Sequence, residues 1–371
     1  NAPVLNAEIS FGETSVKSFT NAQGYFSVYC NILPNEIRVH CMSYNDYKSF
    51  IGDSQPIRIF LSHKAYDLCS VDIVVEKPRD LMPGIRYQIM DFEFSGNNLI
   101  LLALKKQSLF SPELLLVDTS GKILYTYEIN RPIKLYRDFD EKVFLITPST
   151  AYEINTDSNH LRLVNPVDIK SFEQINNVIV GHMGNNYLLK QYMYNNQVLN
   201  YFNYDEINDS LRCFRTIADN GAIQRNRWGS YFNGREEDMR FQQIIMNRPV
   251  EAPLVRINDT IMVFNFLNSE LEKYSSEADT FSEKPIIFHR DKGFSKVILN
   301  DKGQARIYFL FVKNGISQLK EIDTNDGRVI QTIDIPDFVY VEKIKVHNGI
   351  IYFLYKSREL SEYKKLYVMK I

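Results

Sequence analysis

The stretch Asn98-Leu-Ile-Leu-Leu-Ala-Leu-Lys105, followed after a break by Glu113-Leu-Leu-Leu-Val-Asp118, decides the fold of this chain. Both segments are apolar runs of strand length, and the turn dipeptide Gly96-Asn97 precedes the first of them. Similar strand-like segments return at intervals of about 35–50 residues up to the C-terminus. Further copies are Thr260–Leu267, Ala305–Lys313, Gly349–Lys356 and Lys365–Ile371. A repeat of this period built from short strands predicts an all-β fold with a β-propeller, in which small sheets surround an axis.

The bulk composition agrees with an all-β protein and excludes some classes of function. The chain has 371 residues, of which 44% are hydrophobic and 13% aromatic, with 24 Phe and 23 Tyr. This usage favours strands over helices. The formal net charge of −2 argues against a dedicated nucleic-acid surface, which is normally basic. No apolar run approaches the ~20 residues of a membrane-spanning helix, so we expect no transmembrane segment.

Six propeller blades are predicted from the repeat. Their ranges are Tyr87–Ile129, Ile133–Val167, Ser171–Ala218, Leu254–His289, Phe294–Ile335 and Val339–Ile371. The sixth range supplies only three strands. We predict that Val71–Lys77 provides the fourth and closes the ring, which removes free sheet edges. The propeller domain then covers residues 71–371, although Val71–Lys77 also suits the last strand of the domain that precedes it.

Residues 1–70 predict a small antiparallel β-sandwich. Short strand-like segments alternate with turn signals such as Pro34-Asn35 and Gly52-Asp53. The segments are Ala7–Phe11, Tyr25–Cys30, Ile37–Met42 and Ile57–Leu61. The four cysteines of the chain, Cys30, Cys41, Cys69 and Cys213, have no zinc-ligand spacing, and we expect buried thiols in a core.

Four ordered segments of this region resemble carboxypeptidase-regulatory-like domains, which have a transthyretin-like β-sandwich fold. The segments are Thr20-Asn-Ala-Gln-Gly-Tyr-Phe-Ser27, Met42-Ser-Tyr-Asn-Asp-Tyr-Lys48, Ile57-Arg-Ile-Phe-Leu61 and Leu68-Cys-Ser-Val-Asp-Ile-Val74. The sequence departs from the family pattern in two places, since the opening strand is missing before Asn1 and Asp46 stands where the family has glycine. The resemblance implies a non-catalytic module of exported proteins and carries over no catalytic residue.

The second region resembles the six-bladed propellers found in cell-envelope proteins of Bacteroidetes, whose function is unknown. The two resemblances together imply a location in the cell envelope, periplasmic or attached to the outer membrane. They also admit a lipid anchor upstream of Asn1. The ligand or protein partner is not identified by the sequence, and a glycan or a peptide fits this class of protein.

Residues 219–253 interrupt the repeat and form an insertion between blades three and four. Within it, Arg235–Met246 carries apolar residues at a helical period, which predicts a short helix. Aromatic and arginine side chains are frequent anchors of recognition. The tentative ligand-binding residues are Arg225, Arg227, Trp228, Tyr231, Phe232 and Arg235. The alternative is that Trp228 and Phe232 pack onto the propeller as ordinary buried side chains.

No catalytic motif, cofactor fingerprint or metal-ligand spacing occurs in the sequence. The six histidines are scattered, and the acidic turns, such as Asp138-Phe-Asp-Glu141, suit hairpins. Arg137 and Asp138, at the inner strand of blade two, are expected to line the channel as a structural ion pair. We therefore predict no catalytic residue, cofactor or metal, and a non-catalytic binding or scaffolding protein that uses one propeller face. The alternative is a hydrolase or lyase acting on glycans or peptides at the axis.

Overall fold

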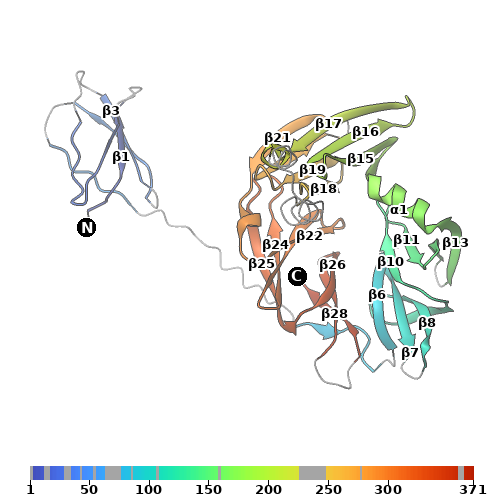
Figure 1. Ribbon diagram of the computed structural model, residues 1–371. Coiled ribbons are helices and arrows are strands. Elements are labelled where there is room, and N and C mark those ends of the chain that lie inside the picture. Colours follow the sequence, from blue (N-terminus) through green and yellow to red (C-terminus); the bar gives the residue numbers. More distant parts are fainter. Residues whose placement is uncertain are drawn as a thin grey trace, which may run out of the picture. The chain divides into compact units, whose positions relative to one another are not determined.

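The chain divides into two compact units, Asn1–Ile73 and Val74–Ile371, each described here by itself (Figure 1). The computed structural model describes residues 3–11, 17–28, 35–41, 44–52, 56–62, 77–84, 87–105, 108–157, 160–224, 248–275, 278–357 and 363–371. The predicted domain boundary falls between residues 70 and 71, three residues before the division between the two units. No helix among these residues is long and apolar enough to cross a membrane.

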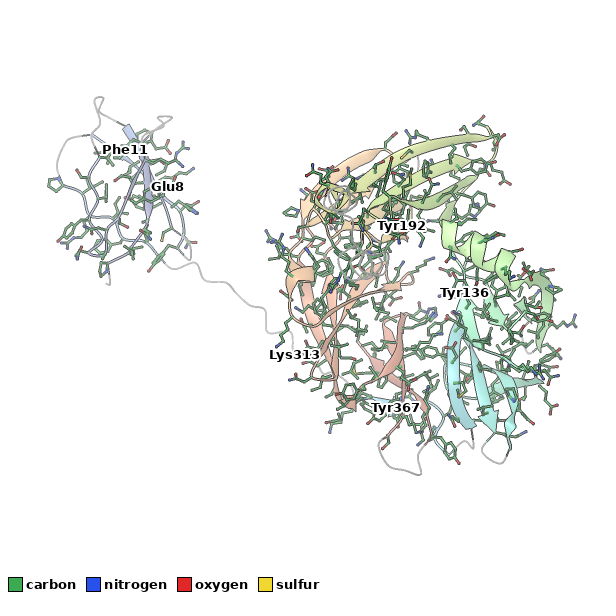
Figure 2. The ribbon with its side chains drawn as sticks, in the orientation of Figure 1. Glu8, Phe11, Tyr136, Tyr192, Lys313 and Tyr367 are labelled. Carbon is green, nitrogen blue, oxygen red and sulfur yellow. The ribbon has the colours of Figure 1, made fainter. Side chains whose placement is uncertain are left out.

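The first unit contains a four-stranded antiparallel sheet in the order β2-β1-β3-β4. Its strands are β1 (Glu8–Phe11), β2 (Lys17–Phe19), β3 (Asn35–His40) and β4 (Tyr47–Ile51). Strand β1 alternates as a half-buried strand does, since Ile9 and Phe11 are buried while Glu8 forms an ion pair with Lys17 (Figure 2).

Two segments predicted as strands in this unit are not strands over their described residues, 25–28 and 57–61. They contribute by side-chain packing instead, because Phe26, Val28, Ile59 and Leu61 all lie against the core of the sheet. The sequence pattern therefore identified the buried side chains of these segments correctly but not their main-chain pairing.

The second unit is a six-bladed β-propeller, as predicted: its described residues form six four-stranded antiparallel sheets that follow one another around an axis (Figure 1). Blade one has β6 (Tyr87–Ser95), β7 (Asn98–Lys105), β8 (Ser108–Val117) and β9 (Ile123–Glu128). Blade two has β10 (Lys134–Arg137), β11 (Val143–Ile146), β12 (Thr150–Asp157) and β13 (His160–Asp168). Blade three has β14 (Ile179–Met183), β15 (Asn186–Met193), β16 (Val198–Asp205) and β17 (Ser210–Ala218).

The remaining blades repeat this pattern. Blade four has β18 (Leu254–Ile257), β19 (Thr260–Asn265), β20 (Glu270–Tyr274) and β21 (Thr280–Pro285), and the short helix η1 (Phe288–Arg290) follows it. Blade five has β22 (Phe294–Asp301), β23 (Arg306–Lys313), β24 (Ile316–Ile322) and β25 (Val329–Val339). Blade six has β26 (Glu342–His347), β27 (Ile350–Tyr355), β28 (Lys365–Lys370) and β5 (Arg79–Asp80).

The first strand of each blade faces the axis, as β6 beside β10 and β22 beside β26 illustrate (Figure 1). Because the strands are antiparallel, the turns between strands one and two and between strands three and four share one end of the propeller. We call this the turn end. The turns between strands two and three, and the links from one blade to the next, share the opposite end, which we call the link end.

Strand β5 supplies the fourth strand of blade six by pairing with β28, with Asp80 opposite Tyr367 and Arg79 opposite Val368. The ring is thus closed by a segment N-terminal to blade one, slightly further along the chain than the predicted Val71–Lys77. Lys77 is not in a strand, and residues 71–76 lie outside the described residues, so the pairing expected for them stays a prediction.

Buried ion pairs reinforce this closure at the inner strands. Lys343 of β26 contacts Asp91 of β6 at 2.5 Å and Glu93 at 2.8 Å, and Lys345 also pairs with Glu93. Asp91 further accepts a hydrogen bond of 2.8 Å from the main chain of Leu135. Charged contacts therefore join blades six, one and two near the axis, in addition to the apolar clusters between these blades. Burial lowers the pKa of Lys345.

Apolar clusters fill most spaces between neighbouring blades. Between blades five and six, Phe338 lies 4.7 Å from Tyr367 and 5.1 Å from Phe353, measured between ring centroids (Figure 2 labels Tyr367). The space between blades two and three is different, because no cluster of described buried side chains joins these two sheets directly. A helix, α1 (Ile169–Val178), links the two blades there.

Helix α1 corrects the sequence prediction, in which the strands of blade three were expected from Ser171 onward and no helix was expected there. Asp168 caps the helix by accepting hydrogen bonds from the main chain of Lys170 and Ser171. Phe172 anchors the helix on blade two, with its ring centroid 4.8 Å from that of Phe144. The strand β14 therefore starts only at Ile179.

One expectation about the cysteines is also wrong. Cys213 on β17 is exposed rather than buried, with its sulfur 3.6 Å from the hydroxyl oxygen of Thr216. Cys41 is half-buried at the core of the first unit, close to what was expected. Cys30 and Cys69 lie outside the described residues.

Candidate functional site

The stretch predicted as an insertion between blades three and four, residues 219–253, lies between the end of β17 and the start of β18. All six tentative ligand-binding residues, Arg225, Arg227, Trp228, Tyr231, Phe232 and Arg235, lie in the stretch 225–247, outside the described residues. The predicted helix Arg235–Met246 lies in the same stretch. The binding role of these residues therefore stays a prediction.

The described ends of the insertion are attached to the link end of blade three. The main chain of Asp219 donates to the carbonyl of Gln197 at 2.9 Å, and that of Val250 donates to the carbonyl of Asn196, also at 2.9 Å. The Tyr201 hydroxyl donates to the carbonyl of Ala252 at 2.6 Å. The chain therefore leaves the propeller and returns to it at the turn between β15 and β16.

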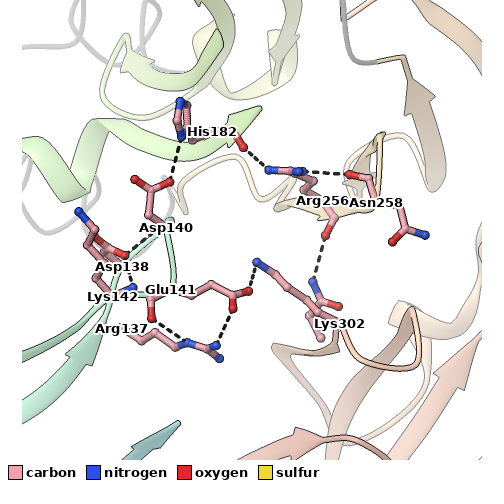
Figure 3. Close-up of polar contacts among 10 residues, drawn as sticks. Arg137, Asp138, Asp140, Glu141, Lys142, His182, Arg256, Asn258 and Lys302 are labelled. Carbon is pink, nitrogen blue, oxygen red and sulfur yellow. Dashed lines mark hydrogen bonds and ion pairs between the residues drawn. The ribbon is translucent and has the colours of Figure 1, made fainter. Parts of the chain in front are cut away.

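A pocket of about 400 Å³ lies at the turn end, lined by residues from four blades. We call it the mouth pocket. Its charged or titratable members are Asp140 and Glu141 of blade two, His182 of blade three, Arg256 of blade four and Lys302 of blade five. Their convergence depends on the ring, because they come from first strands and first turns that are far apart in the sequence (Figure 3). A concave site with a few convergent polar groups is the usual form of a small-molecule site.

Ion pairs connect opposite sides of the mouth pocket. Glu141 accepts from Arg137 at 2.8 Å, and its other oxygen pairs with Lys302 across the axis (Figure 3). The His182 Nδ1 atom lies 3.1 Å from the Asp140 carboxylate, and the imidazole stacks on Tyr187 with ring centroids 4.4 Å apart. The two acidic side chains of the mouth pocket are thus each matched with a basic partner.

Arg256 is the exception among these charges. Its guanidinium donates to the main-chain carbonyl of His182 and, at 2.9 Å, to that of Asn258 (Figure 3). No carboxylate of the described residues forms an ion pair with it. Two neutral carbonyls hold the guanidinium in place at the pocket, and they leave its positive charge uncompensated by an acid.

The electrostatics of the mouth pocket keep its best-paired carboxylate ionised. Burial alone would raise the pKa of Glu141, but the hydrogen bond from Lys302 and the charge of Arg137 lower it below its ordinary value. Burial raises the pKa of Asp138, whose Oδ1 atom accepts main-chain hydrogen bonds from Asp140 and Lys142 at 2.9 and 2.8 Å. Asp138 therefore acts as the first residue of a tight turn that presents Asp140 and Glu141.

His347 stands beside this group on blade six. Burial and then the positive charge of Arg137 lower its pKa, and its ring stacks on Phe94 with centroids 4.4 Å apart. The neighbouring turn is tied to blade five, since the buried Asp301 accepts hydrogen bonds from the main chain of Asn348 and Gly349 at 2.9 and 2.7 Å. The turns around the mouth are thus fixed to one another by polar contacts.

The sequence identified part of this pocket without assembling it. The acidic turn Asp138–Glu141 was noticed as a hairpin, and Arg137 was expected to pair with Asp138, whereas the structure pairs Arg137 with Glu141. Arg256 and Lys302 gave no signal, because each lies next to an ordinary hairpin turn. The repeat did contain usable information. Each charged residue of the mouth pocket lies at the end of the first strand of its blade or in the turn that follows it, and is therefore expected near the axis.

The mouth pocket offers no preformed metal centre. Over the described residues, no group of three or more His, Cys, Asp or Glu side chains is placed to hold a metal ion.

Comparisons with known proteins give no family. No protein-family model matches the chain, and no curated protein matches it. Among solved structures, a member of the DUF4221 family from Bacteroides vulgatus is similar, with a TM-score of 0.38 and 9% identity over 80% of this chain and 97% of that one. The β-propeller domain of the trilobed protease from Pyrococcus furiosus aligns with a TM-score of 0.34 and 10% identity over 77% of this chain and 84% of that one.

A luciferin-regenerating enzyme gives a TM-score of 0.35 and 9% identity, over 77% of this chain and 92% of that one. At such scores these likenesses carry no argument about function. The resemblance of residues 1–70 to carboxypeptidase-regulatory-like domains stays a prediction, and so does the location in the cell envelope.

Proposed function

We propose that this chain is a non-catalytic binding protein of the cell envelope, and that the mouth pocket recognises an acidic group of a glycan or a peptide. The observation that carries the proposal is Arg256, a guanidinium fixed by two carbonyls at a pocket and paired with no acid among the described residues. Arginine is well suited to carboxylate, sulfate and phosphate groups because its donors form a planar fork. Lys302 of the neighbouring blade five lines the same pocket, where its charge is matched by Glu141.

The arrangement of acids supports binding rather than hydrolysis. A glycosidase needs one carboxyl that is protonated near neutral pH beside a second, ionised one. In the mouth pocket, Glu141 is held ionised by Lys302 and Arg137, and Asp140 is paired with His182. Asp138 has a raised pKa, but its Oδ1 atom is occupied by two main-chain donors. A hydrolase or lyase acting at the axis therefore remains the less supported alternative.

The test is the variant Arg256→Gln, with tri-galacturonic acid and N-acetylmuramyl dipeptide as acidic probes in isothermal titration calorimetry. Losing a charge-assisted hydrogen bond of about 1.5–3 kcal/mol should weaken binding by roughly 10- to 100-fold. The matched control is Arg328→Gln, because this arginine also lies at the turn end but is 84% exposed and outside the pocket. Binding that Arg256→Gln leaves unchanged, or no binding of either acid at millimolar concentration, would reject the proposal.

A further inference from the structure

A second hollow lies at the opposite end of the propeller, between blades one and two. It has a volume of about 640 Å³, and its lining includes the link residues Asn130 and Arg131 and the turn residues Thr147 and Ser149. Both segments belong to the link end. This hollow, which we call the link-end groove, is therefore separate from the mouth pocket, and its size is within the usual range of about 300–1,000 Å³ for small-ligand sites.

The groove borders the apolar cluster between blades one and two, in which the link residue Ile129 is buried together with Leu135 and Leu145. Between blades four and five, the link folds into η1 and places Phe288 in the gap, with its ring centroid 4.7 Å from that of Phe309. Further rings, Phe266 and Phe294, complete that packing at 5.1 Å from each other. Between blades one and two the corresponding link, residues 129–133, buries Ile129 but places no aromatic ring in the gap, and the groove lies beside it.

The lining of the groove combines flat apolar surface with unused hydrogen-bonding groups. Tyr127 of β9 and Tyr152 of β12 are half-buried and pack against the apolar cluster that contains Ile129 and Leu145. Neither tyrosine ring stacks on another ring of the described residues. Their hydroxyls reach solvent and have no hydrogen-bond partner in that part of the chain, so they are available to a ligand.

The rim of the groove also carries polar side chains that are free to bind a ligand. Asn130 and Arg131 are exposed, and neither side chain forms a hydrogen bond or an ion pair within the described residues. Arg131 adopts a left-handed backbone conformation with φ of 47°, which is uncommon for a residue other than glycine. The lining further includes the carboxylate of Glu128 and the hydroxyls of Ser111, Thr147 and Ser149, so polar groups surround the apolar floor of the groove.

We propose that the link-end groove binds a pyranose unit of a neutral oligosaccharide. A sugar ring has apolar C–H faces, which suit the tyrosine rings, and an edge of hydroxyls, which suit the free phenol, amide and guanidinium groups. A purely apolar ligand would leave those polar groups unpaired, at a cost of about 1–3 kcal/mol for each that becomes buried. A neutral sugar satisfies both parts of the lining. The site goes beyond the acidic-group recognition proposed for the mouth pocket and does not depend on it.

The experiment measures binding of maltotriose, mannotriose, xylotriose and triacetylchitotriose to the full chain by saturation-transfer NMR and calorimetry. At least one of these trisaccharides should bind the unmodified protein, and Tyr152→Ala should weaken that binding by about tenfold or more, or 1.4 kcal/mol. Arg131→Asn should also weaken it. Because Arg131 is exposed and asparagine tolerates its backbone conformation, this second variant tests the site even where Tyr152→Ala fails to fold.

Two controls separate this site from its alternatives. Tyr125→Ala changes a tyrosine two residues away on β9 that contacts His160 instead of the groove, and it should leave trisaccharide binding within about twofold. Arg256→Gln should also leave it unchanged, so the two proposed sites succeed or fail independently. Absence of binding by all four trisaccharides overturns the proposal, as does binding that neither Tyr152→Ala nor Arg131→Asn alters. Displacement of the bound sugar by a proline-rich peptide, with tighter binding of the peptide, would assign the groove to a protein partner instead.

Discussion

Neighbouring blades are held together by different contacts in two gaps of the propeller, the one between blades four and five and the one between blades two and three. The first is closed by phenylalanine rings, among which Phe309 is fully buried and lies 4.9 Å from Phe264. The second is spanned by helix α1 and, at the turn end, by the polar contact of His182 with Asp140. A dry aromatic interface stabilises without offering a binding surface, whereas a polar interface keeps charged groups accessible at the mouth.

The contrast between the aromatic gap and the polar gap indicates where a binding site can lie in this propeller. Apolar burial contributes about 25 cal/mol per Å² and needs no exact pairing, so aromatic gaps hold the ring together. Exposed ion pairs contribute little, at a median of about 0–1 kcal/mol, and they can exchange partners with a ligand at low cost. We therefore expect stability to depend on the aromatic gap and recognition to depend on the polar one.

The largest effect is expected from Phe309→Ala in the aromatic gap. Removing a fully buried phenylalanine leaves a cavity and should lower the free energy of unfolding by about 3–5 kcal/mol. The matched variant in the polar gap is Phe139→Ala, whose half-buried ring lies 6.3 Å from that of Tyr187; it should cost less than about 2 kcal/mol. Urea denaturation measures both. Equal losses would show that the two gaps are not energetically different.

A smaller effect is expected from Phe172→Ala on helix α1. This side chain is the one buried residue of the helix, and its loss should cost about 2 kcal/mol and release the helix from blade two. Hydrogen exchange should then increase over Ile169–Val178 while the aromatic gap stays protected. Ile175→Ala is the control, because this residue is 51% exposed on the same helix. Unchanged exchange in the Phe172 variant would mean that the helix is held by its main chain and cap alone.

The smallest effect on the free energy of unfolding is expected when the pH is lowered and Glu141 in the mouth pocket becomes protonated. The pKa of Glu141 is lowered from 4.5 in the folded chain, so its stabilisation is present above about pH 4.5 and is lost as the pH falls through the folded value. Because Glu141 is 40% exposed, the difference between the unmodified chain and Glu141→Gln should stay below about 1 kcal/mol. Denaturant titrations from pH 7 to about pH 3 should show this difference shrinking. A difference that grows on acidification would contradict the lowered pKa.

Much of the blade structure was predictable from local sequence. The segments Asn98–Lys105 and Glu113–Asp118 of blade one were expected where β7 and the second half of β8 lie, because apolar runs and the turn at Gly96 act over a few neighbouring residues. Helix α1 was missed because Asp168 and Phe172 carry a capping and packing signal that the surrounding strand repeat obscured. The prediction of a strand at residues 57–61 of the first unit was wrong. Apolar alternation indicates which side chains are buried, but it does not show that the main chain pairs with a neighbouring strand.

The candidate sites were much less predictable. The sequence directed attention to Trp228 and its neighbours, because aromatic and arginine clusters stand out in a linear reading. Arg256 and Lys302 do not stand out, since the feature that distinguishes them is which residues they face. The link-end groove has no sequence signal, because it depends on how Tyr127, Tyr152 and Arg131 are placed relative to one another in the folded ring.

The sequence alone determined that this chain forms a six-bladed propeller preceded by a small β domain, since strands and tight turns depend on interactions between near neighbours. It also determined that closure must join segments from the two ends of the propeller. Only the tertiary structure decided that β5 is the closing strand, that Glu141 meets Lys302 across the axis, and that a groove lies beside the gap between blades one and two. These contacts join residues far apart in the chain, so their chemistry is fixed by the geometry of the closed ring.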